Sequence, residues 1–190
     1  MTRTVVVTGS ASGIGAATRA RLEHDGARVI GIDLRDADVI ADLGTGEGRL
    51  AAVSSVEAIA PRLDAVVCCA GIDVRAPITV RVNYAASKRA LCRWVRRQAP
   101  TADWAGAGIP LNAVAPGIVR TPMVEHHFDD DQKRATIERN VPMPLHGPGE
   151  PEQVAALLAW LAGPENVLVT GQIVFADRGA DAVLRGDDVW

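Results

Sequence analysis

A run of β-branched residues that ends in a glycine-rich turn constrains this fold more than any other feature. Residues 3–9 read RTVVVTG, and the turn continues as SASGIG through Gly15. An apolar run of this kind is typical of a strand that is buried on both faces. Residues 13–25 then place apolar side chains near helical spacing, and Gly26 follows them as a stop. The chain is therefore predicted to begin with a buried strand, a tight turn and a helix.

The same alternation of apolar runs and helical patterns continues to the other end of the chain. Strands are expected at 28–34, 38–43, 63–71, 109–117 and 171–177, and helices at 84–99, 129–140 and 150–163. This alternation predicts an α/β fold, a doubly wound parallel sheet of the Rossmann-like type, and we interpret residues 1–190 as a single domain. The stretch 121–149 lacks a clear strand, and we expect it to be a loop that covers a substrate.

Composition and charge argue against several classes of protein. The chain has 190 residues, 48% of them hydrophobic, and a formal net charge of −3. Without a basic run we expect no nucleic-acid partner, and without a long apolar stretch we expect no membrane partner. Cys68 and Cys69 are interpreted as reduced thiols, which favours a cytoplasmic protein. His126 and His127 beside the acidic run 129–131 are interpreted as solvent-facing, so no metal site is expected.

Three glycines of the first turn stand in the context that a dinucleotide-binding fingerprint requires. Gly9 permits the tight turn, Gly13 lets the backbone approach a pyrophosphate, and Gly15 permits close packing of the helix. The first N–H groups of the helix are free to bind phosphate. Asp33 ends the next strand, where a carboxylate accepts a hydrogen bond from the ribose 2′-hydroxyl and favours NAD over NADP. Arg35 weakens that preference because it could neutralise a 2′-phosphate.

The spacing T-G-x-x-x-G-x-G resembles the short-chain dehydrogenase/reductase family, and other motifs resemble it further along the chain. Residues 69–71 resemble the end of the family's N-N-A-G strand, with cysteines at 68 and 69 in place of the asparagines. Residues 84–88 read YAASK, similar to the family's Y-x-x-x-K motif. Residues 116–121 resemble the turn that receives the nicotinamide carboxamide. The resemblance implies NAD as cofactor, bound by Gly9, Ser10, Ser12, Gly13, Ile14, Gly15, Asp33, Asp42, Leu43, Ala70, Gly71, Tyr84, Lys88, Pro116, Gly117, Ile118 and Thr121.

One branch of the family, the bacterial 3α-hydroxysteroid dehydrogenase/carbonyl reductases, resembles the chain most closely over residues 13–43 and 171–188. Arg178 stands where that branch usually has a glycine, a difference that we expect to lie away from the chemistry. The resemblance implies hydride transfer between NAD(H) and a hydroxysteroid or another apolar secondary alcohol or ketone. A coniferyl-type aromatic alcohol is the alternative substrate. The resemblance also implies a homo-oligomer, a dimer or a tetramer.

Apolar residues on either side of the helix at 129–140 are the candidates for a substrate pocket. One group follows the turn at 116–121, and the other lies just before residue 146. The alternative to a substrate pocket is that these residues only pack within a covering loop. These residues are Met123, Val124, Phe128, Pro142, Met143 and Leu145.

Tyr84 and Lys88 carry the proton-transfer chemistry that the resemblance implies. A tyrosine with an ordinary pKa of about 10 is a poor base at neutral pH, and a lysine at i+4 lies on the same helical face and favours the phenolate. The family also uses an asparagine to hold a water for proton relay, for which Asn83 is the candidate, and a serine to polarise the substrate oxygen. No residue between Gly71 and Tyr84 corresponds to that serine.

Asn83 directly precedes Tyr84, whereas the family places these two residues on separate helices with a serine-bearing strand between them. Either a segment is missing from the sequence at this point, which we favour, or the chain is continuous across a deletion. Adjacent residues of one helix lie about 100° apart around its axis, so these two side chains could not converge on one atom. For a continuous chain the alternative prediction is a catalytically inactive NAD-binding module.

Overall fold

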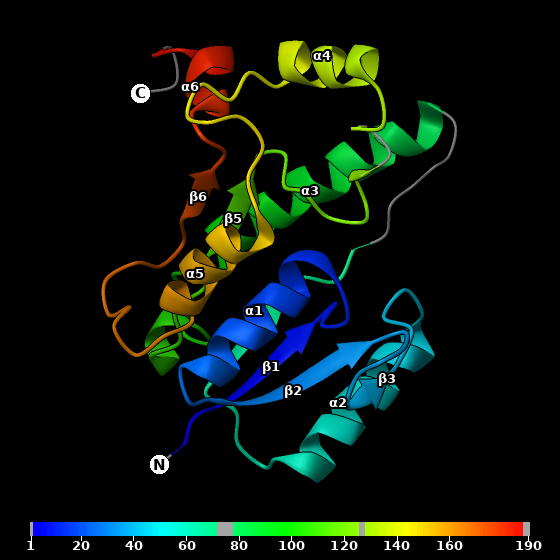
Figure 1. Cartoon of the computed structure of the whole chain (residues 1–190). Coiled ribbons are helices and arrows are strands. Elements are labelled where there is room, and N and C mark those ends of the chain that lie inside the picture. Colours follow the sequence, from blue (N-terminus) through cyan, green and yellow to red (C-terminus); the bar gives the residue numbers. More distant parts are fainter. Residues whose placement is uncertain (1, 72–77, 126–127, 188–190) are drawn as a thin grey trace.

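The computed structural model describes residues 2–71, 78–125 and 128–187 (Figure 1). Its core is a four-stranded sheet in the order β3-β2-β1-β4, in which every pair of neighbours is parallel. The strands are β1 (Thr4–Thr8), β2 (Arg28–Asp33), β3 (Val39–Ile40) and β4 (Ala65–Cys68). The predicted parallel α/β fold is therefore confirmed.

Helices cover both faces of this sheet. Side chains alternate between the two faces of a strand, so each strand packs against both layers of helices. Val5, Val7 and Val67 face α1 (Gly13–His24) and α5 (Pro151–Leu161), which lie side by side in Figure 1. Val6 and Ile30 face the opposite side and pack with α2 (Gly46–Ile59). The β-branched run at the start of the chain is thus buried on both faces, as its sequence predicts.

Helix α2 has no counterpart among the helices predicted from sequence. Its N-cap is Thr45, whose hydroxyl accepts a hydrogen bond from the N–H of Gly48 at 2.9 Å. Only Ala52 and Val56 of the helix are buried, so the apolar stripe is too narrow to stand out from the surrounding residues. Packing against the sheet, more than local pattern, accounts for this helix.

The last two strands form a separate sheet. β5 (Ala113–Pro116) pairs in parallel with β6 (Ile173–Ala176), and within the described residues β5 forms no ladder with β4. The sheet is therefore divided at the place where the family resemblance expects a further strand with a serine. β5 is also shorter than the predicted 109–117, because the side chain of Asn112 bonds the carbonyl of Val169 and the N–H of Gln172 just before the strand begins.

Helix α3 (Ile78–Gln98) runs without interruption through Asn83 and Tyr84. The predicted helix at 84–99 therefore begins six residues earlier than expected, because no cap or turn separates the two motifs in the continuous chain. The remaining helices are a short 3-10 turn (Ala105–Ala107), α4 (Asp131–Asn140) and α6 (Ala180–Arg185). α4 begins after Asp130, whose carboxylate accepts a hydrogen bond from the N–H of Lys133 at 2.7 Å. Among the helices in the described ranges, none is long and apolar enough to cross a membrane.

Candidate functional site

The turn between β1 and α1 is built on glycines that no other residue could replace without strain. Gly9 and Gly13 have φ values of +69° and +52°, in the left-handed region. A Cβ on Gly9 would lie 2.8 Å from the N of Ala70, and a Cβ on Gly15 only 2.0 Å from the carbonyl oxygen of Gly9. The turn therefore folds tightly against both the end of β4 and the first turn of α1.

Polar groups of this turn point to a ligand with hydrogen-bonding atoms. The hydroxyl of Ser10 is buried, at 4% exposure, and it has no hydrogen-bond partner within the described residues. Ser12 is the N-cap of α1, but its side chain makes no capping bond. A buried polar atom without a partner is uncommon in a folded protein. The Ser10 hydroxyl is nevertheless enclosed beside β2, since a Cβ on Gly31 would lie 2.5 Å from it. The exposed hydroxyl of Ser12 and the first N–H groups of α1 are the groups that fit a phosphate.

Asp33 lies at the carboxyl end of β2, beside the glycine-rich turn. Its Oδ2 accepts a hydrogen bond from the N–H of Ala11 at 2.9 Å, and its Oδ1 accepts one from the N–H of Leu34 at 2.7 Å. These bonds fix the carboxylate while each oxygen keeps a second lone pair for a ribose hydroxyl. Arg35 is exposed.

The end of β4 is tied to β1 through a threonine side chain. The hydroxyl of Thr8 accepts a hydrogen bond from the N–H of Ala70 at 3.1 Å, and the carbonyl of Thr8 accepts one from the N–H of Cys69 at the same distance. Burial raises the pKa of the Cys69 thiol to about 11, so this cysteine remains protonated at neutral pH. All three cysteines are free, with Cys68 exposed and Cys69 and Cys92 half-buried.

Asp42 and Leu43 precede α2. Asp42 accepts a hydrogen bond from the N–H of Gly44 at 2.9 Å through Oδ1, which shapes the turn into the helix. Leu43 packs on the core cluster that includes Val39 and Ala41. Both residues therefore have structural contacts in addition to the NAD-binding role that the family resemblance implies for them.

The segment after β5 approaches the glycine-rich turn from the opposite side. A Cβ on Gly13 would lie 3.1 Å from the methyl carbon of Thr121, so these two segments are in close contact. Gly117 donates its N–H to the carbonyl of Ala176 at 3.2 Å, and Ile118 accepts a hydrogen bond from the N–H of Gly149 at 2.8 Å. The carboxyl ends of β1, β4 and β5 thus meet around one place, as expected for a ligand site in an open α/β sheet.

Tyr84 and Lys88 lie together on α3, but the surrounding residues leave them open to solvent. Lys88 Nζ lies 5.2 Å from the centroid of the Tyr84 ring, and Tyr84 is 46% exposed. Ser87 donates its hydroxyl to the carbonyl of Tyr84 at 2.7 Å, so it does not stand in for the family's serine. Asn83 is the preceding residue of the same helix, and its side chain lies outside the described atoms. The predicted Tyr–Lys pairing is present in the structure, although no described residue closes over it.

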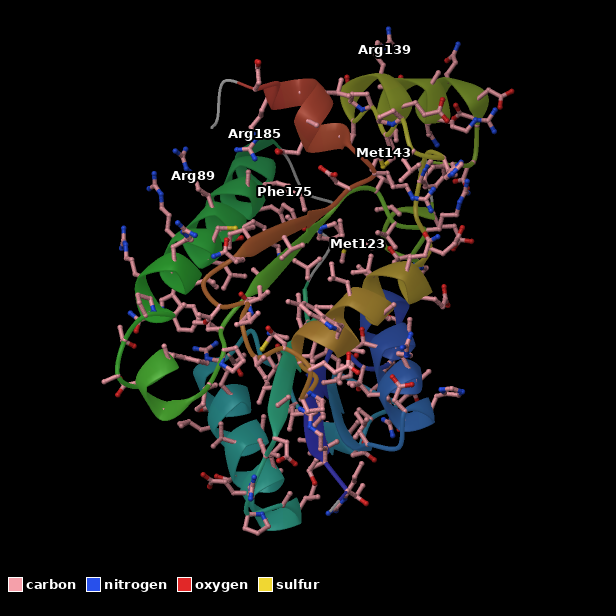
Figure 2. All side chains as sticks on the ribbon, turned by 90° about the vertical axis from the view of Figure 1, so that its left-hand side faces the viewer. Arg89, Met123, Arg139, Met143, Phe175 and Arg185 are labelled. Carbon is pink, nitrogen blue, oxygen red and sulfur yellow. The ribbon has the colours of Figure 1, made fainter. Side chains whose placement is uncertain are left out.

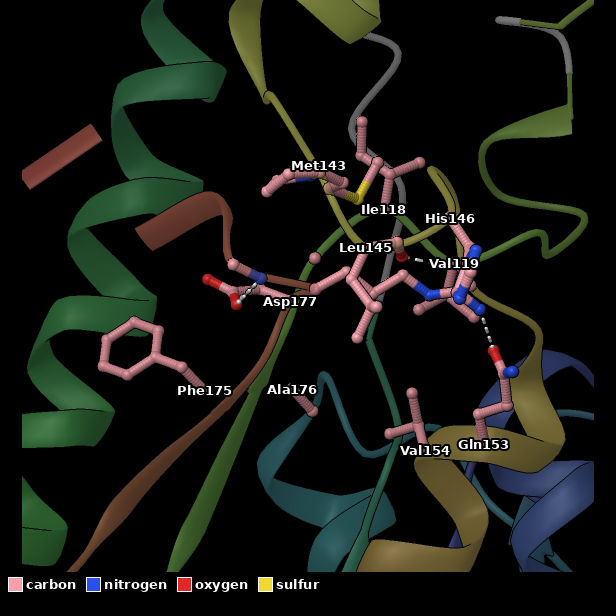
Figure 3. Close-up of a pocket in the computed structure, with 15 residues that line it drawn as sticks. Ile118, Val119, Met143, Leu145, His146, Gln153, Val154, Phe175, Ala176 and Asp177 are labelled. Atoms are coloured by element: carbon pink, nitrogen blue, oxygen red, sulfur yellow. Dashed lines mark hydrogen bonds between the residues drawn. The ribbon is translucent and has the colours of Figure 1, made fainter. Parts of the chain in front are cut away.

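A cavity of about 790 Å³ opens at the carboxyl ends of β5 and β6 (Figure 3). Of the residues expected to form a substrate pocket, Met143 and Leu145 line this cavity, and Pro142 lines a smaller one of about 340 Å³. Met123, Val124 and Phe128 are not among the residues that line these two cavities, and their role in a substrate pocket stays a prediction. The rest of the larger cavity is lined by Gly117, Ile118 and Val119, with Val154 and Gln153 of α5 and the turn 177–179.

Comparison with known proteins explains this architecture. A family model described as enoyl-(acyl carrier protein) reductase matches residues 47–181, more than half of the chain. The 3-alpha-hydroxysteroid dehydrogenase/carbonyl reductase of Comamonas testosteroni is 31% identical over an alignment that covers 95% of this chain and 97% of that protein. The chain belongs to the short-chain dehydrogenase/reductase family. It is therefore a member of an oxidoreductase family.

Two further relatives support this membership. The 3beta-hydroxysteroid dehydrogenase 1 of Eggerthella lenta is 41% identical over 97 residues, which are 51% of this chain and 36% of that protein. The crystal structure of the 3-alpha-hydroxysteroid dehydrogenase from Pseudomonas sp. B-0831, complexed with NADH, superposes with a TM-score of 0.82 at 30% identity. It covers 97% of this chain and 99% of that one.

The alignment with the Comamonas protein also bears on the junction at Asn83 and Tyr84. It extends over 253 positions, whereas this chain has only 190 residues. That relative therefore has residues inside the aligned region that this chain lacks, which agrees with the internal gap predicted from the motifs.

Proposed function

We propose that the chain binds NAD(H) in the turn between β1 and α1 and transfers hydride to or from an apolar secondary alcohol or ketone of the hydroxysteroid class. The observation that supports nucleotide binding is the tight glycine turn at the N-terminus of α1, where a Cβ on Gly15 would lie 2.0 Å from the carbonyl oxygen of Gly9. The structure of the Pseudomonas relative with NADH supports the same assignment. The relatives named as hydroxysteroid dehydrogenases support the substrate class.

Each part of the nucleotide has candidate residues in this proposal. The pyrophosphate would lie against residues 9–15, where the backbone N–H groups and the exposed hydroxyl of Ser12 can donate hydrogen bonds. Asp33 would accept a hydrogen bond from the adenosine ribose, which favours NAD over NADP. Asp42 and Leu43 would contact the adenine, with Ala70 and Gly71 at the end of β4. The nicotinamide would lie near residues 116–121, and when bound it supplies the hydride acceptor or donor.

The proton would be moved by Tyr84. A phenol next to a substrate oxygen can donate a proton to a nascent alkoxide or accept one from an alcohol. Lys88 would stabilise the phenolate and contact the nicotinamide ribose, and Asn83 would support proton relay. The loop 121–149 would exclude water from the substrate, because Met143 and Leu145 already contribute to the apolar cavity at the nicotinamide side.

A second candidate function is nucleotide binding without efficient turnover. Two observations favour it: the side chain of Tyr84 is 46% exposed, and the nearby hydroxyl of Ser87 is engaged by the backbone of its own helix. Without a serine to polarise the substrate oxygen, the transition state would lose a hydrogen bond that typically contributes a factor of about 10²–10³ to the rate.

The two functions are separated by measuring NADH binding and turnover on the same sample. Titration of NADH fluorescence should show binding under both functions, and oxidation of a 3α-hydroxysteroid with NAD should occur only under the first. Replacement Tyr84→Phe should abolish turnover and leave NADH affinity unchanged. Unchanged turnover in this variant would exclude Tyr84 as the proton donor.

The intact mass of the purified chain decides whether Asn83 and Tyr84 are bonded directly. A mass of 20.0 kDa corresponds to the continuous 190-residue chain and favours nucleotide binding alone. A mass several kilodaltons higher would show that a further segment carries the missing strand.

A further inference from the structure

Arg178 is the one arginine that lines the larger cavity in the described part of the chain. Most of the lining is apolar, including Ile118, Val119 and Met143. Figure 3 shows Leu145, His146 and Val119 on one side of this space, with Val154 and Gln153 of α5 below them. A cavity of about 790 Å³ lies in the range that binds small organic molecules. Asp177 also lines the cavity, but both of its carboxylate oxygens accept backbone N–H groups. The cation of Arg178 therefore favours an apolar ligand that has one anionic group.

The backbone holds Arg178 in an unfavourable conformation. Its φ is +56°, in the left-handed region that side chains other than glycine, asparagine and aspartate rarely adopt. His146, which also lines the cavity, has a φ of +66°. Strained backbone of this kind is concentrated at binding and catalytic sites. Two strained residues on the wall of one cavity therefore point to a function for that wall.

The side chain of Arg178 is held in place by two neutral acceptors. Its NH1 donates to the carbonyl of Leu145 at 3.1 Å, and its NH2 donates to Oε1 of Gln153 at 2.6 Å. The guanidinium has five N–H groups, so three remain after these two hydrogen bonds. The cation is thus positioned by the protein while most of its donors stay available to a ligand.

The positive charge of Arg178 is not neutralised by a neighbouring carboxylate within the described residues, since no ion pair includes it there. Asp177 precedes Arg178 in the sequence, but its carboxylate is directed at the backbone of Gly179 and the following helix. Its Oδ1 accepts a hydrogen bond from the N–H of Gly179 at 3.0 Å, and its Oδ2 accepts one from the N–H of Asp181 at 2.7 Å. Arg178 can therefore form an ion pair with a ligand.

We infer that the cavity beside Gly117 and Ile118 binds apolar carboxylates and that Arg178 is the residue that recognises the carboxylate. The planar guanidinium matches the two oxygens of a carboxylate better than a lysine ammonium would. This inference rests on the proposed function for the identity of the apolar part, a hydroxysteroid. It goes further in assigning an acidic side chain to that ligand and a specificity role to Arg178.

The test compares lithocholic acid, a hydroxysteroid with a carboxylate at the end of its side chain, with its methyl ester. Calorimetric binding to the full chain should favour the acid by about tenfold, the factor that corresponds to one charge-assisted hydrogen bond at a partly exposed site. Arg178→Gly should remove this preference, because it deletes the cation while glycine suits the positive φ and preserves folding. Arg178→Lys should retain only part of it.

Arg89→Met is the matched control, because it removes the same charge from a residue that is exposed on α3 and points away from the body of the protein (Figure 2). It should leave the acid preference intact. Equal binding of the acid and the ester to the unmodified chain would overturn the inference, as would an acid preference that survives in Arg178→Gly.

Failure of the proposed function has a different signature. In that case NAD is not reduced with either steroid, while the Arg178-dependent preference for the acid is still measured. Turnover of both steroids at equal affinity would have the opposite meaning, since it would support the proposed function and exclude the role of Arg178.

Discussion

Lys88 lies over the ring of Tyr84, with its Nζ 5.2 Å from the ring centroid, on a part of α3 that is open to solvent. The two residues are four positions apart in one helix, so the helix alone brings them together. The contact between Tyr84 and Lys88 does not depend on the serine-bearing strand that, in the family, lies between the asparagine and the Y-x-x-x-K motif. The Tyr–Lys pair can therefore persist in a chain whose surrounding site is incomplete.

The pair gives a first prediction about catalysis. Lys88→Met should lower turnover at neutral pH by at least about tenfold, because the ammonium no longer stabilises the phenolate form of Tyr84. Steady-state rates of NAD reduction with a 3α-hydroxysteroid measure the effect. Arg93→Met, an exposed cation on the same helix, should leave the rate unchanged. An equal loss in both variants would indicate a general charge effect and not a role for Lys88.

The glycine-rich turn gives a second prediction. Gly15→Ala should abolish NADH binding and lower the thermal midpoint, because the new Cβ would lie 2.0 Å from the carbonyl oxygen of Gly9 and force the turn open. The matched control is Gly46→Ala at the start of α2, where the nearest atom to the new Cβ is a guanidinium nitrogen of Arg49 at 3.9 Å. Fluorescence titration and circular dichroism should show normal binding and folding for this control. If Gly15→Ala still binds NADH, the nucleotide lies elsewhere.

Asp33 gives a third prediction, which concerns the choice of cofactor. Asp33→Asn should shift the ratio of NADH to NADPH affinity towards NADPH by about tenfold, because the carboxylate that repels a 2′-phosphate is lost. Asp64→Asn is the control, since Asp64 also accepts a backbone N–H, that of Thr4 at 2.8 Å, but at the opposite end of the strands. It should have no effect on the ratio. An unchanged ratio in both variants would contradict the assignment of Asp33 to the ribose.

Local features of the sequence account for the elements that were predicted correctly. The run of three valines, Val5 to Val7, followed by a glycine is sufficient to define β1 and the turn after it. α2 was missed because its burial depends on Ala52 and Val56 meeting the sheet, which no local pattern shows. Tertiary contacts determine whether such a helix forms.

The site was predicted less completely than the fold. The glycines, Asp33 and Thr121 are predicted as cofactor-binding residues because they lie at or after the carboxyl ends of strands, and this role stays a prediction. Arg178 was expected to lie away from the chemistry, yet it lines the cavity beside Gly117. Its one signal was an arginine where the related sequences have a glycine. The direction of its side chain depends on Leu145 and Gln153, which lie 33 and 25 positions away in the sequence.

Cys69 gives a fourth prediction, about the dependence of stability on pH. Burial raises the pKa of its thiol in the folded protein to about 11, above the value of about 8.5 in an unfolded chain. The neutral thiol therefore contributes fully to the stability of the folded state below pH 8.5, and this contribution is lost as pH rises through 11. We expect the free energy of unfolding to fall by about 1–3 kcal/mol over that range. Urea unfolding should show a larger loss in the native chain than in Cys69→Ala, where a loss remains because burial also raises the pKa of the Cys68 thiol.

The exposed half of α3 gives the last prediction. Leu91 is 47% exposed and Val95 is 2% exposed, although they lie one turn apart on the same helix. Val95→Ala should destabilise a monomer of the continuous chain by about 2 kcal/mol, whereas Leu91→Ala should change its stability by less than about 0.5 kcal/mol. Urea denaturation of the two variants measures both values.

The Leu91 variant has a second use, because its effect reports what covers α3. A loss of about 2 kcal/mol or more on Leu91→Ala would mean that this face of the helix is buried in solution, since only burial gives a leucine that value. Repeating the measurement over a hundredfold range of protein concentration then distinguishes the causes. A second copy of the chain would make the loss depend on concentration, because association stabilises the folded state by mass action. A further strand within the same chain would give the same loss at every concentration.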